Sequence, residues 1–175
     1  MHFFRLLLTC SLFCAGSALA DISAFATGPA IKEYGPVAEV PGAVPLPGDA
    51  RFKVAFDTSK AAEGSKPNRT LETAARFINM HVANGVPVEN IEVAVVVHGP
   101  AHRDLLRASA RSDGNTSAPL IAELLALGVQ IHLCGQTASF YDVTLAELLP
   151  GVQMSLSAMT SHALLQQQGY TLNPF

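Results

Sequence analysis

Four side chains with acid, base or nucleophile chemistry stand where short apolar runs of the sequence end. They are Asp57, His98, Cys134 and Ser157, and each follows residues typical of a buried β-strand. In an open parallel sheet the carboxyl ends of the strands share one edge, and ligands bind at that edge. We therefore expect these four side chains to lie close together at the ligand-binding edge of a sheet.

Cys134 carries the most distinctive chemistry of the four. It ends a predicted strand and precedes Gly135, Gln136 and Thr137, where the glycine permits close backbone approach. Backbone N–H groups in such a segment stabilise a thiolate and lower the pKa of a cysteine. We therefore interpret Cys134 as a reactive thiol and residues 135–137 as the loop that holds its thiolate or a small anion. The alternatives are that Cys134 packs as a small apolar side chain, as free cysteines commonly do, or pairs with a cysteine of another molecule.

His98 is the predicted acid–base partner that tunes this thiol, and the alternative for it is an ordinary hydrogen bond to a neighbouring loop. Three further residues complete the predicted ligand-binding set. Ser157 and Thr160 stand near the start of the last predicted helix and can add hydrogen bonds from the neighbouring strand end. Asp57 ends the first predicted strand and completes the set.

A metal site is the weaker interpretation of the histidines. His98 and His102 straddle Gly99-Pro100 instead of sharing a helix face, and one cysteine lacks the spacing of a structural zinc site. His132 shares a side of its strand with the cysteine, yet suits a core or interface position equally well. The sequence also lacks a dinucleotide, P-loop or Gly-x-Ser-x-Gly pattern. We predict no metal and no cofactor; a metal site would combine His98 and Cys134 with His81, His102, His132 or His162.

The elements that must position these residues alternate between strand and helix patterns. Runs rich in β-branched residues predict strands over 52–56, 91–97, 129–133, 152–156 and 170–172. Apolar residues at helical spacing predict helices over 71–82, 101–107, 119–127, 143–149 and from Ser157 or Thr160 to 168, with Ser117 capping the third of these. This order is typical of an α/β fold built from βα units around a mostly parallel sheet of about five strands.

The first fifty residues differ from the rest of the chain. Residues 1–20 combine a basic start, an apolar run too short to span a membrane and Ala18-Leu19-Ala20, which predicts a cleaved signal peptide and export. Residues 21–50, rich in proline and glycine, predict an extended arm before a domain over 51–175. The arm lies along its own domain, along a neighbouring subunit or free in solution. The formal net charge of −3 shows no excess of basic residues of the kind that binds nucleic acid, so we expect no nucleic-acid partner.

Three strings of the sequence carry a resemblance to a known family. They are VVVHGPA over 95–101, IHLCGQTA over 131–138 and LSAMT over 156–160. With the ending over 164–175, the chain resembles exported members of the DsrE/DsrF-like (YchN-like) sulfur-relay family, over residues 52–175. The resemblance implies a three-layer α/β domain that assembles into trimers or hexamers, with the cysteine near a subunit interface. In intracellular relatives a cysteine passes on sulfane sulfur as a persulfide; Cys134 is the position here that could play this part, in a sequence context different from theirs.

Residues and resemblance together predict a periplasmic homo-oligomer that binds or relays sulfane sulfur through Cys134. Its partners are a sulfur donor or acceptor protein or a small sulfur species, and whether this sulfurtransferase-like step is catalytic stays open. One alternative is a small-ligand or metal-binding oligomer in which Cys134 is a contact. Another is a purely structural oligomer in which Cys134 is buried and the arm clasps its neighbour.

Overall fold

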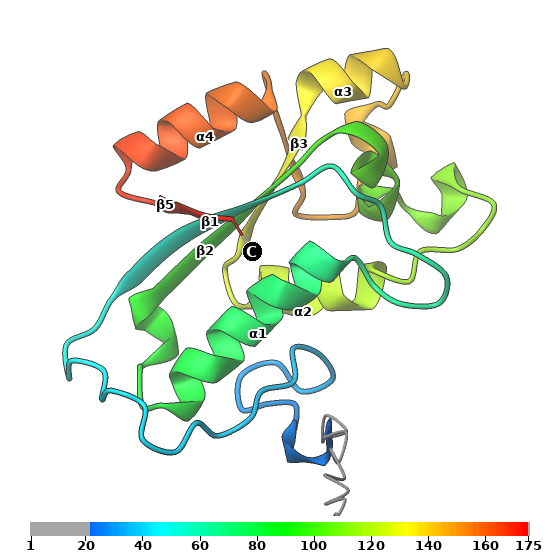
Figure 1. Ribbon diagram of the computed structural model, residues 1–175. Helices are drawn as coiled ribbons and strands as arrows, with labels where there is room; N and C mark the ends of the chain where they lie inside the picture. Colours follow the sequence, from blue (N-terminus) through cyan, green and yellow to red (C-terminus); the bar gives the residue numbers. More distant parts are fainter. Residues whose placement is uncertain (1–21, 175) are drawn as a thin grey trace, which may run out of the picture.

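A five-stranded parallel sheet forms the centre of the computed structural model, which describes residues 22–174 (Figure 1). Helices α1 (Arg69–Ala83) and α2 (Ala118–Ala126) cover one face of the sheet, and α4 (Ala158–Gln167) covers the other. The three-layer αβα fold predicted from the sequence is confirmed. The strands lie in the order β4-β3-β2-β1-β5, with bounds β1 Phe52–Thr58, β2 Ile91–Val97, β3 Gln130–Cys134, β4 Gln153–Ser155 and β5 Thr171–Asn173.

Alternation along the inner strands decides which face of the sheet each side chain takes. Val97 packs into the large core beneath α1 and α2, whereas Ala55 and Val96 pack on the face that α4 covers. Side chains two positions apart on a strand share a face. Asp57 and His98 therefore project from the α4 face at the carboxyl edge of the sheet.

Side-chain caps start α1 and α4 at this same edge. Asn68 Oδ1 accepts the backbone N–H of Thr70 at 2.9 Å and of Leu71 at 3.4 Å. Ser157 Oγ accepts the backbone N–H of Thr160 at 3.0 Å and begins α4, one of the two starts that the sequence allowed. A cap of this kind stabilises a helix by about 1 kcal/mol.

The segment after β3 differs from its prediction. Helix α3 (Gly135–Phe140) begins directly after the strand, where the sequence predicts a loop, and the helix predicted over 143–149 is wrong. A single 3-10 turn, η5 (Leu145–Glu147), stands there instead. The residues after it are held extended, because the N–H of Leu149 donates to Leu105 O at 2.8 Å. This pairing with a distant segment takes hydrogen bonds that a continuing helix would need.

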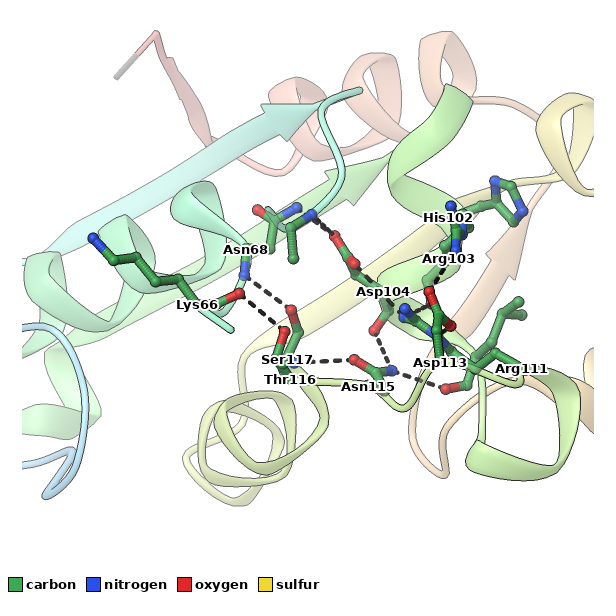
Figure 2. A network of polar contacts seen from close by, with 12 residues as sticks. Lys66, Asn68, His102, Arg103, Asp104, Arg111, Asp113, Asn115, Thr116 and Ser117 are labelled. Carbon is green, nitrogen blue, oxygen red and sulfur yellow. Dashed lines mark hydrogen bonds and ion pairs between the residues drawn. The ribbon is translucent and has the colours of Figure 1, made fainter. Parts of the chain in front are cut away.

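A buried polar network ties together the loops at the carboxyl edge (Figure 2). Asp104 belongs to the 3-10 helix η3 (Gly99–Leu105), which stands where the sequence predicts a helix over 101–107, and accepts a hydrogen bond from Asn68 Nδ2 at 2.8 Å. Ser117 is the N-cap residue of α2, as predicted, but its side chain makes no cap hydrogen bond; its Oγ accepts the backbone N–H of Asn68 at 2.9 Å. The network thereby fixes the loop between β1 and α1 beside the site.

The N-terminal segment of the described chain lies along its own domain. It starts with a 3-10 turn, η1 (Ile22–Ala24), and then crosses α1, where the buried side chain of Asn79 accepts the N–H of Ile31 at 2.8 Å and donates to Gly35 O at 3.1 Å. Gly35 has a φ of +63°, and a Cβ there would overlap the α1 backbone. Ile31 itself is fully buried in the main core. One polar side chain therefore anchors this segment.

Across residues 22–174, no helix is long and apolar enough to cross a membrane. The predicted signal peptide, residues 1–20, lies outside the described residues.

Candidate functional site

Cys134 ends β3 and meets the first turns of α3 and α4. The residue is 6% exposed. Burial acts to raise the pKa of its thiol, but hydrogen bonds to the sulfur outweigh burial and hold the pKa below its ordinary value. The donors are the backbone N–H of Thr137, the backbone N–H of Ala158, the hydroxyl of Thr137 and the backbone N–H of Gln136. The thiolate is thus stabilised from two helices at once.

Gly135 makes this close packing possible. A Cβ at this position would overlap the backbone oxygen of Ser155 and lie 3.0 Å from that of Leu156. The φ of Gly135 lies outside the left-handed region, so the position requires space and not an unusual conformation. Because Gly135 has no side chain, the start of α3 lies against the end of β4. Ala158, whose backbone N–H donates to the Cys134 sulfur, follows β4 closely along the chain.

The side chains of the other residues predicted to hold an anion bind protein atoms. Gln136 Nε2 donates to the backbone oxygen of Leu156, the residue after β4, at 3.3 Å. Ser157 Oγ and Thr160 Oγ1 share a hydrogen bond of 2.9 Å at the start of α4. Thr137 Oγ1 accepts the N–H of Gly99 at 2.9 Å, which ties α3 to the loop after β2. These side chains hold the helix starts in place, and the backbone supplies most of the donors to the sulfur.

A second polar group lies beside the thiol, at the ends of β1 and β2. Asp57 accepts a hydrogen bond from each of two imidazoles: His98 Nε2 lies 3.0 Å from Oδ2, and His162 Nε2 lies 2.8 Å from Oδ1. All three side chains are partly exposed. The sequence predicts the meeting of Asp57 and His98, because both end predicted strands at the same edge of the sheet. The sequence named His162 as a metal candidate and did not place it in this group.

A signal for His162 exists in the order of the elements. The helix after β4 has to cross the sheet to reach β5, which pairs with β1. Its residues therefore pass over the strand that carries Asp57. Recognising this required the strand order, which the sequence pattern did not provide.

His98 and Cys134 lie on neighbouring strands. Val97 pairs with Leu133, so His98 and Cys134 follow as the next residues in register, and neighbouring strands lie about 4.8 Å apart. Among residues 22–174, no hydrogen bond joins the imidazole to the sulfur. The structure brings the predicted pair to one edge, with His98 held by Asp57 and the thiol held by backbone N–H groups.

The remaining histidines of residues 22–174, which are His81, His102 and His132, have structural surroundings. His132 Nδ1 lies 3.2 Å from Ser161 Oγ on α4, and burial, followed by the charge of His162, lowers the pKa of His132. Its Nε2 has no partner among the described residues. Residues 22–174 hold no group of three or more His, Cys, Asp or Glu placed to bind a metal ion. The other two pack on aromatic rings: His102 on Tyr141, and His81 on Phe52 and Phe77.

Residues 52–174 match the DsrE/DsrF-like family. The chain belongs to this family. Two solved structures share its fold: the ychN protein from E. coli, with a TM-score of 0.53 and 17% identity, and the protein of unknown function MTH1491 from Methanobacterium thermoautotrophicum, with 0.50 and 18%. Each match covers 71% of this chain and 99% of the other. At these identities the likeness shows the fold alone. No curated protein matches the chain.

Two surface features border the site of this DsrE/DsrF-like protein. Phe140, Leu156 and Met159 are 79%, 73% and 78% exposed and belong to α3, to the segment after β4 and to α4, which surround the thiol. On the other side, a cavity of about 820 Å³ opens beside Asp57, between the loop after β1 and the first half of α1. Its lining includes four basic side chains: Lys60, Lys66, Arg69 and Arg76.

Proposed function

We propose that this protein receives sulfane sulfur on Cys134 as a persulfide and passes it on. Its family is associated with sulfur relay. The observation that carries the proposal is the set of N–H and O–H donors around the sulfur, which lowers the pKa of the thiol. The thiolate is the form that attacks a sulfane sulfur, and the same donors stabilise a persulfide anion after transfer.

The small exposure of Cys134 limits which sulfur donors can reach its thiol. With 6% of the residue accessible, a broad protein surface makes no contact with the sulfur. We therefore propose that the donor is a small sulfur species, or a persulfide at the protruding tip of a partner protein. Burial of the bound persulfide also protects it from further oxidation, since susceptibility to oxidation follows exposure.

Intact-mass measurement after exposure to polysulfide and removal of excess reagent tests the proposal. The wild type, with its thiol confirmed reduced beforehand, is compared with Cys134→Ser. We expect a reducible gain of whole sulfur atoms on the wild type alone. A wild type that stays unmodified would refute the proposed sulfur relay and favour the ligand-binding or structural alternatives.

We further propose that the protein acts in the periplasm as a homo-oligomer, a trimer or a hexamer. The signal-peptide pattern over 1–20 supports export. The exposed side chains of Phe140, Leu156 and Met159 support a contact between copies, because apolar clusters of this kind mark interfaces. Light scattering on the wild type and on the double variant Leu156→Lys, Met159→Lys tests the assembly. The variant should have the lower mass; equal masses would place the interface elsewhere.

The cavity beside Asp57 favours a second candidate function, the binding of a small anionic ligand without sulfur transfer. Lys60, Lys66, Arg69 and Arg76 line it and outnumber its acidic residues Asp57, Glu63 and Glu72; cationic side chains bind carboxylates and phosphates through charge-assisted hydrogen bonds. Thermal shift with a panel of small anions tests this candidate. Stabilisation that survives Cys134→Ser and disappears in Lys66→Ala would support it, together with an unmodified mass after polysulfide treatment.

A further inference from the structure

Asp57 fixes the protonation pattern of the two imidazoles that it contacts. A carboxylate oxygen only accepts hydrogen bonds, so Nε2 of His98 and Nε2 of His162 each carry a hydrogen. Nδ1 of His98 has no hydrogen-bond partner within residues 22–174. His98 is therefore an oriented imidazole with one nitrogen left to exchange a proton, the arrangement in which a carboxylate holds a catalytic histidine.

The thiol of Cys134 does not need His98 as a base. Backbone N–H groups of α3 and α4 and the Thr137 hydroxyl already stabilise its thiolate. The imidazole makes no hydrogen bond to the sulfur in the described structure, although the two residues are neighbours in strand register. A proton on His98 is therefore available to another atom than the Cys134 sulfur.

Sulfur transfer supplies such an atom. When a thiolate attacks a sulfane sulfur, the attacking sulfur, the transferred sulfur and the leaving sulfur lie nearly in line. The leaving sulfur then stands roughly two S–S bond lengths, about 4 Å, from the attacking sulfur. An acid that serves the leaving sulfur should flank the nucleophile without touching it. His98 is the residue beside Cys134 in strand register, and no hydrogen bond joins the two within residues 22–174.

We propose that His98 is the general acid that protonates the departing thiol, which rests on the proposed function of Cys134. The Cys134 thiolate attacks the outer sulfur of a persulfide R–S–SH, a new S–S bond forms to Cys134 and the original S–S bond breaks. The departing R–S⁻ takes the proton of His98 and leaves as R–SH. The new Cys134–S–SH returns a proton to His98 and remains as the persulfide anion. No electrons are gained or lost in this exchange, and no oxidant is required.

Asp57 and His162 are positioning residues for this acid. Asp57 holds the ring of His98 through Oδ2, and His162 holds the other carboxylate oxygen from α4. Without its second partner the carboxylate is free to rotate away from His98. An amide at position 162 keeps an N–H donor to Asp57. His162→Gln should therefore keep Asp57 in place, whereas His162→Ala should not.

Leaving-group dependence of thiol exchange distinguishes an acid from a residue that merely shapes the thiol. Protonation matters for an alkyl thiol, which leaves poorly, and little for an aromatic thiol, which leaves well. Rates at Cys134 are measured at one pH with bis(2-hydroxyethyl) disulfide, with 4,4′-dithiodipyridine and with iodoacetamide, whose iodide needs no proton. His81→Gln, on the opposite face of the sheet, is the matched control.

We expect His98→Gln to slow exchange with the alkyl disulfide about 10²-fold, within the range that a positioned general acid supplies, and to leave the other two rates unchanged. Asp57→Asn and His162→Ala should show the same selectivity with smaller losses, and added imidazole should restore part of the alkyl rate in His98→Gln. Equal losses with all three reagents, or no loss with the alkyl disulfide, would overturn the assignment. Failure of polysulfide to load the wild type would refute the relay while leaving this result intact.

Discussion

Substitution of Gly135 by alanine tests whether the contact between α3 and β4 builds the thiolate site. The new Cβ would overlap Ser155 O and lie 3.0 Å from Leu156 O, and both are backbone atoms that cannot rotate away. Overpacking of this kind costs about 1–3 kcal/mol. Replacing glycine within a helix returns about 0.5–1 kcal/mol through propensity and loss of unfolded-state freedom. We expect the free energy of unfolding of Gly135→Ala to fall by about 1–2 kcal/mol.

The same substitution should change the reactivity of Cys134. Relief of the overlap moves the end of β4, and with it the Ala158 N–H that donates to the sulfur. The pKa of Cys134 then rises toward its ordinary value, and alkylation near neutral pH becomes slower because less thiolate is present.

Denaturant unfolding and iodoacetamide alkylation followed by mass spectrometry give the two readouts. Gly48→Ala is the matched control, since its Cβ would meet nothing within 4 Å and its φ lies outside the left-handed region. The control should keep the wild-type alkylation rate. If Gly135→Ala keeps both the wild-type stability and the wild-type rate, the contact with β4 does not support the site and the reasoning is wrong.

Three further predictions concern the thiol and the N-terminal segment. Thr137→Val should raise the pH of half-maximal alkylation of Cys134, whereas Thr137→Ser, which keeps the hydroxyl donor, should not. The folded state lowers the pKa of Cys134, so its thiolate adds to the free energy of unfolding above the unfolded pKa near 9.0. This contribution is lost as pH falls through the folded pKa. Denaturation of the wild type and of Cys134→Ala at several pH values should show that the variant lacks this pH-dependent contribution. Asn79→Ala should lower the free energy of unfolding by about 2–4 kcal/mol, because buried backbone groups lose their partners, whereas the exposed control Asn84→Ala should change it by less than about 0.5 kcal/mol.

The sequence predicted the central strands well because their signal is local. The run over 91–97 matches β2 residue for residue, and the chemistry of Asp57, His98 and Cys134 follows from where the strands end. The sequence did not predict α3, because six residues rich in small and polar side chains carry no helical periodicity. It predicted a helix over 143–149 from apolar spacing, whereas backbone pairing with a segment some forty residues earlier keeps that stretch mostly extended.

The part of the site that the sequence left open depends on one helix. Ala158, the first residue of α4, donates its N–H to the sulfur of Cys134, and His162, four residues later, binds Asp57. Helix α4 therefore contacts both halves of the site, through the backbone N–H of its first residue and through a side chain of its second turn. A displacement of α4 would therefore remove one hydrogen bond from the Cys134 thiolate and, at the same time, the contact of His162 with Asp57, the carboxylate that holds His98.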